Sequence, residues 1–301
     1  MNAPSWHQHR GLRGMIALLV TVLGVGWLVG FSADPTELVG QPLSPPSLEH
    51  WFGTNGQGQS VFLRTMAGGA MTLTIAVIVA TLVVCFGTFI GVMAAMQTGR
   101  RARAFDLLIN VTLVIPGLPL VVVIAAYAPP GPLTMIFLLS LTGWAWTARV
   151  MKAQAASLRE RDFVVASKLA GEPTWRIMLY DIVPNLLPIM AASFIGGTTY
   201  AMGAQVGLEF LGLGDLSVVT WGTNLYWAQN DGALLTGAWW TYVPSGLGLA
   251  LIGYLLTVLN RSLDEIANPR LGDQRAWLQH LGKEIDPEPG FTPVVKKVSN
   301  A

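Results

Sequence analysis

The residues best suited to chemistry lie in one charged segment, residues 159–184, set between long apolar runs. It carries four basic and four acidic side chains: Arg159, Arg161, Lys168, Arg176, Glu160, Asp162, Glu172 and Asp181. The segment is neutral overall, yet it is too charged to lie in lipid. Side chains of this kind form ion pairs and hydrogen bonds with water or with a partner protein. The segment is therefore predicted to be a contact surface.

Local signals in this segment predict a helix, a sharp corner and a second helix. Gly171 can adopt the left-handed conformation that ends a first short helix, and Pro173 suits the first turn of the next one.

Motifs for catalysis are missing from the sequence. The Gly282-Lys283 pair lacks the earlier glycine of a phosphate-binding loop, and the four histidines, His7, His9, His50 and His280, lie outside the apolar runs. No Asp, Glu, Lys, Arg or His falls within those runs, whereas proton relays in transporters need such groups. The chain is therefore predicted to be no enzyme and to bind no cofactor or metal.

Composition indicates an all-α integral membrane protein, since 52% of the residues are hydrophobic, 12% are charged and the mean hydropathy is +0.51. The net charge of +1 argues against nucleic-acid binding. Uncharged stretches long enough to cross a bilayer occupy residues 15–31, 65–99, 107–148, 182–208 and 232–260. The third is long enough for two helices with a turn at residues 129–132, so six spans are predicted.

The distribution of Lys and Arg predicts the orientation, because these residues are held on the cytoplasmic side. Six basic residues lie between Arg149 and Arg176, whereas residues 32–63, 129–132 and 212–240 contain none. Both termini and the charged segment are therefore expected in the cytoplasm. A cleaved signal peptide over residues 1–33 is the alternative for the first span, although Phe31 fits the cleavage site poorly.

The charged segment resembles the EAA loop of ATP-binding-cassette (ABC) importer permeases, which reads E-A-A, three residues, G and later I-L-P. The corresponding residues are Val165, Ala166, Ser167, Gly171, Ile182, Val183 and Pro184. In that family the loop forms coupling helices that rest in a groove of a cytoplasmic ATPase. The resemblance implies that residues 161–182 dock an ATPase, with the coupling residues Arg161, Asp162, Ala166, Ser167, Gly171, Glu172, Pro173, Ile182 and Pro184.

Further matches resemble the C-type permease subunit of dipeptide, oligopeptide and nickel importers, and they extend over residues 50–272. They are His50, Gly53, Thr54 and Gly58, then residues 208–214, Trp221, Gly222, Asp264 and residues 268–271. The sequence departs from that pattern at Val165, Asn55, Gln59, Ser60 and residues 215–217. Val165 replaces the usual Glu, so docking is expected to depend more on shape and on Arg161 and Asp162. The external departures leave the substrate open.

The resemblance implies a type I ABC importer permease in the inner (plasma) membrane of a prokaryote. Its implied partners are a homologous second permease, two cytoplasmic ATPases that bind ATP and Mg²⁺, an external binding protein and the lipid bilayer. Closure of the ATPases would move the corner at Gly171 and rock the neighbouring helices as rigid bodies. Pro184 and Pro188 either fix a bend in this connection or, in the alternative reading, Pro184 simply starts a helix.

Four residues near the outer ends of the last two spans are candidates for the substrate path: Glu209, Asp215, Trp221 and Asp231. The alternative is that the carboxylates are solvated loop charges and that Trp221 belongs to an interfacial aromatic belt. Three Gly-x-x-x-Gly pairs, Gly26/Gly30, Gly87/Gly91 and Gly203/Gly207, are expected to pack spans together or against a second permease.

The chain is therefore divided into an N-terminal part (residues 1–64), a permease core (65–264) with the coupling loop at about 159–184, and a cytoplasmic tail (265–301). The predicted function is peptide import powered by partner ATPases. An ATP-independent channel or secondary carrier remains the alternative, and within the ABC reading so does a nickel-chelate or oligosaccharide substrate.

Overall fold

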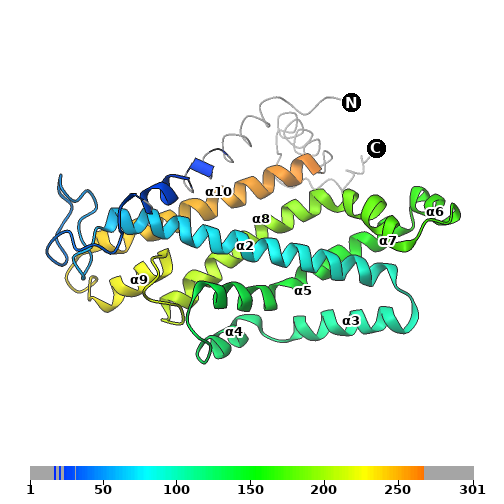
Figure 1. Ribbon diagram of the computed structural model, residues 1–301, viewed down its shortest axis with the longest axis horizontal. Coiled ribbons are helices and arrows are strands. Elements are labelled where there is room, and N and C mark those ends of the chain that lie inside the picture. Colours follow the sequence, from blue (N-terminus) through cyan, green and yellow to red (C-terminus); the bar gives the residue numbers. More distant parts are fainter. Residues whose placement is uncertain (1–16, 18–19, 22–23, 31, 268–301) are drawn as a thin grey trace, which may run out of the picture.

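The computed structural model (Figure 1) describes residues 17, 20–21, 24–30 and 32–267, and the structural statements below concern that part of the chain. The chain is mostly helical, and its long helices run side by side along the long axis of the molecule. The elements are α2 (Val61–Met96), α3 (Gly99–Val114), α4 (Gly117–Ala125), α5 (Pro132–Arg159), α6 (Asp162–Leu169), α7 (Thr174–Arg176), the π-helix η1 (Ile177–Ile182), α8 (Val183–Phe210), α9 (Trp221–Asn230), the 3-10 helix η2 (Trp239–Thr241) and α10 (Val243–Ala267).

Four helical segments of the described chain are long and apolar enough to cross a membrane: residues 61–96, 132–159, 174–210 and 243–263. The pair formed by α3 and α4 passes the same test as one span with a bend of 73°. These segments account for five of the six predicted spans and make the chain a multi-pass membrane protein. Of the first predicted span, residues 15–31, the structure describes residues 17, 20–21 and 24–30, which are helical, and nearly all of the predicted tail, residues 265–301, lies outside the described residues.

The third predicted span differs from the structure in its start and its course. The helix begins at Gly99 and not at residue 107, so three arginines lie in its first turns. It breaks at Ile115, which has the extended values φ −69° and ψ 125°. Pro116 explains the break, because a proline disfavours helical geometry at the residue before it and has no N–H to donate. The predicted turn at residues 129–132 is confirmed, since α5 begins at Pro132.

The last predicted span begins later than the sequence indicated. Residues 232–242 form turns and η2, and the continuous helix starts only at Val243. Gly232 and Gly237 have φ values of +66° and +73°, and these left-handed conformations interrupt a helix. The apolar composition of this stretch was therefore a wrong sign of helix.

Helix α2 is the centre of the bundle and packs along α5 and α8. Added Cβ atoms on Gly87 and Gly91 would lie 2.7 Å from Thr147 Cβ and 2.5 Å from Ala148 O, so these glycines let α2 and α5 approach closely. A Cβ on Gly26 would likewise meet Ala70 Cβ at 2.8 Å. Packing between spans is therefore confirmed for two of the three glycine pairs.

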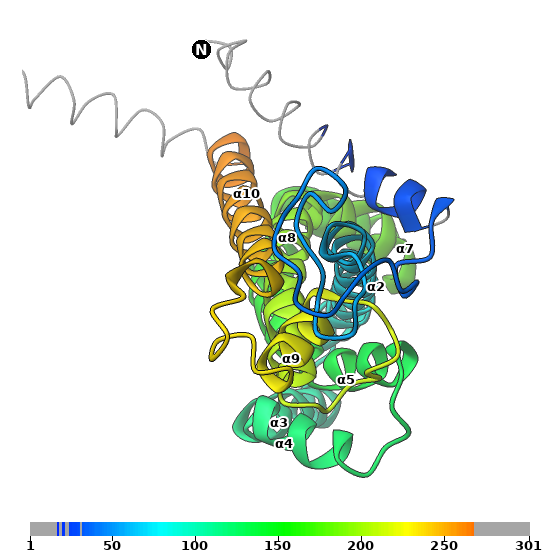
Figure 2. The same ribbon diagram turned by 90° about the vertical axis from the view of Figure 1, so that its left-hand side faces the viewer.

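Gly203 and Gly207, the third pair, have no atom of the described chain within 4 Å of an added Cβ. They lie on a face of α8 that the described part of the chain leaves open. The molecule has two distinct ends: α6 and α7 form one, here called the coupling end, and α9 with residues 33–60 forms the other, here called the loop end (Figures 1 and 2).

Candidate functional site

The corner predicted at Gly171 is present at the coupling end. Helix α6 ends at Leu169, and Gly171 has φ +80°. Its N–H donates to Lys168 O at 3.1 Å, and the Glu172 N–H donates to Ser167 O at 3.1 Å. This pair of hydrogen bonds is the Schellman arrangement, which satisfies the last carbonyls of a helix and requires a left-handed residue. The sequence therefore encodes the sharp turn locally.

The second half of the corner continues directly into a membrane span. Pro173 is the N-cap of α7, one residue before the predicted first turn. The π-helical turn η1 then joins α7 to α8 as one helical segment, residues 174–210. Pro184 lies in the first turn of α8, as the alternative reading expected, and Pro188 lies inside the helix.

One face of the corner is anchored in a buried cluster at the coupling end. Val164 of α6 and Ile182 of η1 are fully buried, and they share this cluster with Met151 of α5 and Val92 of α2. Removing such side chains from water stabilises packing by roughly 1.5–3 kcal/mol each. Ile182 therefore holds the corner to the bundle and is not part of its outer surface.

The other predicted coupling residues stand on the outer surface of the corner. Arg161, Asp162, Ala166, Gly171, Pro173 and Pro184 are exposed, and Ser167 and Glu172 are partly buried. Large apolar side chains are exposed beside them: Leu169 by 85%, Trp175 by 59%, and Phe163 and Val165 by 43% each. Apolar groups gathered on an otherwise charged surface are typical of a protein interface. Sequence analysis missed Leu169 and Trp175, although both stand out as apolar positions within a charged stretch.

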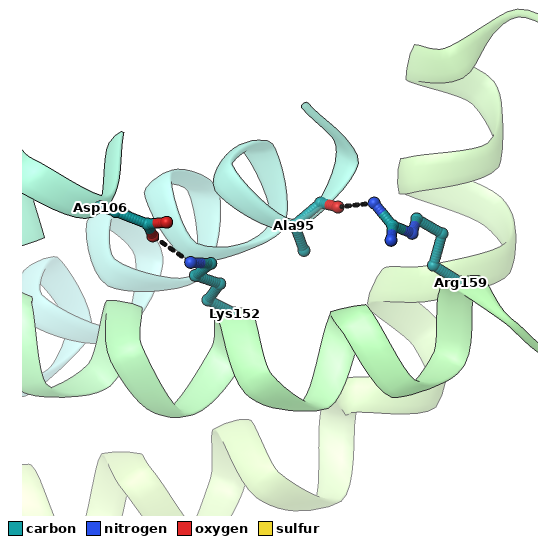
Figure 3. Close-up of polar contacts among 4 residues, drawn as sticks. All are labelled: Ala95, Asp106, Lys152 and Arg159. Atoms are coloured by element: carbon teal, nitrogen blue, oxygen red, sulfur yellow. Dashed lines mark hydrogen bonds and ion pairs between the residues drawn. The ribbon is translucent and has the colours of Figure 1, made fainter. Parts of the chain in front are cut away.

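Polar contacts tie the ends of three helices together close to the corner (Figure 3). Arg159, the last residue of α5, donates from Nη1 to Ala95 O of α2 at 2.8 Å. A positive group at this carbonyl also interacts favourably with the negative end of the α2 dipole. Two turns before Arg159 on α5, Lys152 forms an ion pair with Asp106 of α3.

A concave face lined by α2, α3, α4, α5 and α8 encloses a cavity of about 680 Å³. Its polar lining includes Thr112, Thr147, Ser193 and Tyr200, and none of the described lining residues carries a charge. The candidate path residues Glu209, Asp215, Trp221 and Asp231 do not line this cavity. They all lie toward the loop end, on α8 and α9 and in the loops beside them.

Glu209 is not a solvated loop charge, because only 4% of the residue is exposed. Its carboxylate accepts hydrogen bonds from Thr220 Oγ1 at 2.6 Å and from Gln205 Nε2 at 2.9 Å. An added Cβ on Gly222 would lie 2.4 Å from Glu209 Oε2, so the carboxylate fills a space that two facing backbones leave open. Glu209 thus ties α8 to the start of α9.

Trp221 is also buried, with 3% exposure, and so does not belong to an interfacial belt. Its indole N–H donates to Thr65 O at 2.9 Å, and added Cβ atoms on Gly69 and Gly248 would lie 2.6 and 2.7 Å from its ring. The ring is therefore sandwiched between α2 and α10. It borders a second, apolar cavity of about 660 Å³ together with Trp51, Trp239 and Trp240.

Replacing Trp221 with alanine is expected to lower the free energy of unfolding by about 3–5 kcal/mol, because a large buried ring leaves a cavity. Thermal unfolding in detergent measures the effect. The matched control is Trp239→Ala, since Trp239 is 53% exposed and its loss should matter far less. Equal shifts in Tm for the two variants would contradict a central role for Trp221.

The two remaining candidate carboxylates, those of Asp215 and Asp231, have different surroundings. Asp215 accepts bonds from Ser217 N at 3.0 Å and Ser217 Oγ at 2.5 Å within an exposed turn, as a loop charge does. Burial raises the pKa of Asp231, against the opposing effects of a hydrogen bond from the Gly56 N–H and of the Arg64 charge. Asp231 therefore belongs to the packing between α9 and residues 33–60.

Arg64 is a structural residue that sequence analysis missed. It is 5% exposed in the first turn of α2, and it donates to Asn224 Oδ1 at 2.9 Å and Gln59 Oε1 at 2.5 Å. Its position in the sequence could have revealed this role. Arg64 directly precedes an apolar run and follows a segment without Lys or Arg, and an arginine in that position needs hydrogen-bond partners. Gln59, one of the departures from the family pattern, is one of those partners.

Comparisons with known proteins agree with this geometry. Residues 87–272 match the family model described as "Binding-protein-dependent transport system inner membrane component". The dipeptide transport system permease protein DppC of Bacillus subtilis is 31% identical over 263 residues, 85% of this chain and 80% of that protein. The oligopeptide transport system permease protein OppC of the same organism is 29% identical, covering 75% of this chain and 74% of that protein.

Among solved structures, the inward-facing MetNI methionine ABC transporter matches with a TM-score of 0.53 and 16% identity. The match covers 68% of this chain and 95% of that one. At this identity the likeness supports the fold alone, which is that of a type I importer permease.

Proposed function

This chain belongs to the binding-protein-dependent transport system inner membrane components, and from that premise we propose that it is a peptide-conducting permease subunit. A conformational change of a partner ATPase would move the corner at Gly171. The family makes it a transport permease. The substrate, the docking residues and the orientation in the membrane are the parts that we propose.

The observation that carries the proposal is that the corner has a buried inner side and an exposed, partly apolar outer side. Its inner side is fixed by Val164 and Ile182, which are fully buried against the ends of the long helices. Its outer side presents Leu169 and Trp175, exposed by 85% and 59%. A surface that is rigidly attached and apolar on its outer side is suited to receive a protein partner. Displacement of that partner would be passed to the bundle and not absorbed in a loop.

The charge-free cavity of about 680 Å³ supports a role in conduction. Hydroxyl groups and glycines in its lining offer weak contacts to a passing polar chain without holding any one side chain tightly. Its open face and the uncovered Gly203 and Gly207 of α8 favour a second, homologous permease as the element that closes the path.

The proposal extends to the rest of the assembly. ATP and Mg²⁺ would bind to two cytoplasmic ATPases and not to this chain, which would contribute no catalytic group. An external binding protein would deliver substrate to the loop end. The coupling end and both termini would then face the cytoplasm of a prokaryotic cell, in agreement with the basic residues at the start of α3 and between Arg149 and Arg176.

Peptides are the proposed substrate because the relatives named above are permeases of dipeptide and oligopeptide transport systems. Reconstitution of the chain with its partner subunits in liposomes tests this proposal. ATP-dependent accumulation of labelled di- and oligopeptides is expected, with nickel chelates and oligosaccharides as competing substrates. Passage of substrate through the chain alone, without ATP, would instead support a channel or secondary carrier.

A further inference from the structure

A third cavity of about 270 Å³ lies between α3 and α5 and is lined by Asp106, Ile109, Asn110, Arg149 and Lys152. Asp106 and Asn110 are four residues apart on α3, while Arg149 and Lys152 are three apart on α5. Each pair therefore shares one helix face. The two faces meet across the cavity, as the Asp106–Lys152 ion pair shows (Figure 3). Four polar side chains thus converge where the apolar lining of the bundle ends.

The charges in this cavity do not balance. Lys152 is neutralised by Asp106, which leaves Arg149 as an excess positive charge. Within the described residues Arg149 makes no hydrogen bond or ion pair, and its side chain is exposed. The amide of Asn110 is exposed beside it and likewise has no hydrogen-bond partner there. Together they offer up to seven N–H donors and one unpaired cation, which is the chemistry that binds a carboxylate.

The position of the cavity indicates where such a carboxylate would come from. The next residues along the same helices, Thr112 and Leu113 on α3 and Trp146 and Val150 on α5, line the cavity of about 680 Å³. The charged cavity therefore adjoins the charge-free one on the side of the coupling end. An exposed, unpaired arginine on a membrane-spanning helix is costly in lipid and is found facing water-filled pathways. This placement favours a solute in the path over a lipid headgroup.

We propose that Arg149, assisted by Asn110, binds the C-terminal carboxylate of a peptide as it leaves the charge-free cavity toward the coupling end. The inference rests on the proposed function and adds to it a named contact and a chemical requirement of the substrate. The Asp106–Lys152 ion pair positions the site, because it fixes the spacing of α3 and α5 and keeps Lys152 from repelling or replacing Arg149. No bond is made or broken, and the peptide is released when the helices move.

The test compares reconstituted complexes that carry Arg149→Gln, Arg149→Lys or Arg101→Gln, with ATP-driven uptake of one labelled peptide as the readout. The peptide is used in two forms, with a free C-terminus and with an amidated C-terminus, each at a concentration that saturates the binding protein. Arg101→Gln is the matched control, because Arg101 is an exposed arginine of α3 that does not line the cavity.

Arg149→Gln is expected to slow uptake of the free peptide by about tenfold, the size of one charge-assisted hydrogen bond, and to leave the amidated peptide unchanged. Arg149→Lys should retain part of the rate, and Arg101→Gln all of it. Equal slowing of both peptides, or no slowing of either, overturns the inference. So does an effect that appears only in liposomes containing anionic lipid, since it would assign the site to a phosphate headgroup. If the wild-type complex takes up no peptide, it is the proposed function that fails.

Discussion

Replacing Gly171 with valine is expected to leave the protein folded and inserted but to lower substrate-stimulated ATP hydrolysis by at least tenfold. Gly171 has φ +80°, and an added Cβ there would meet no atom of the described chain within 4 Å. The penalty is therefore not a clash but backbone strain of about 1–2 kcal/mol, which the corner can relieve by opening. An opened corner would point α6 away from the proposed ATPase partner. ATPase activity of the purified complex, measured with and without substrate and binding protein, reports the loss.

Gly99 provides the matched control for this variant. It also lies at the coupling end, has φ +63° and would have no neighbour within 4 Å of an added Cβ, yet it connects α2 to α3 and lies outside the corner. Gly99→Val introduces comparable strain and should leave coupling largely intact. Equal losses in both variants would show that strain anywhere at the coupling end is harmful, and the special role of Gly171 would then be lost.

Replacing Leu169 with aspartate is the second change with a large expected effect, on assembly and not on folding. Leu169 is 85% exposed, so its loss should change the free energy of unfolding by no more than about 0.5 kcal/mol. If it inserts into the ATPase, a buried charge at that point should weaken binding by at least about thirtyfold, the equivalent of a 2 kcal/mol hot spot. Trp175→Asp is expected to behave in the same way. Co-purification of the ATPase from detergent extracts measures the effect.

The control for assembly is Leu235→Asp, an equally drastic change at a side chain that is 93% exposed at the loop end. It should leave ATPase recovery unchanged because it lies at the opposite end of the molecule. If Leu169→Asp also retains the ATPase at wild-type levels, the exposed apolar side chains of the corner are not its docking surface.

The features that were predicted correctly from the sequence are those that neighbouring residues determine. The left-handed Gly171, the turn before Pro132 and the apolar spans each follow from a few neighbouring residues, and the structure contains all three. The break at Pro116 was missed because an uninterrupted apolar run was read as continuous helix. The helix-breaking conformations of Gly232 and Gly237 were missed for the same reason.

The remaining errors concern contacts between distant parts of the chain. Glu209 was a candidate for the substrate path, with a solvated loop charge as the alternative, but its environment is set by Thr220 and by the backbone at Gly222, which no local pattern reveals. Arg149 was interpreted as a marker of topology, because only the meeting of α3 and α5 shows that Lys152 has a partner and that Arg149 has none among the described residues. The roles of the coupling residues remain predictions, although their placement on one corner supports them.

The unbroken connection from the corner into α8 has a mechanical consequence. Residues 174–210 form a single helical segment of about 55 Å, and no glycine occurs between Gly171 and Gly196. Under the proposed function, a displacement applied at the coupling end would be transmitted along this helical segment to the loop end. Because coupling free energies are reciprocal, the same segment would also transmit in the opposite direction. Binding of substrate at the loop end would then change the affinity of the coupling end for its ATPase.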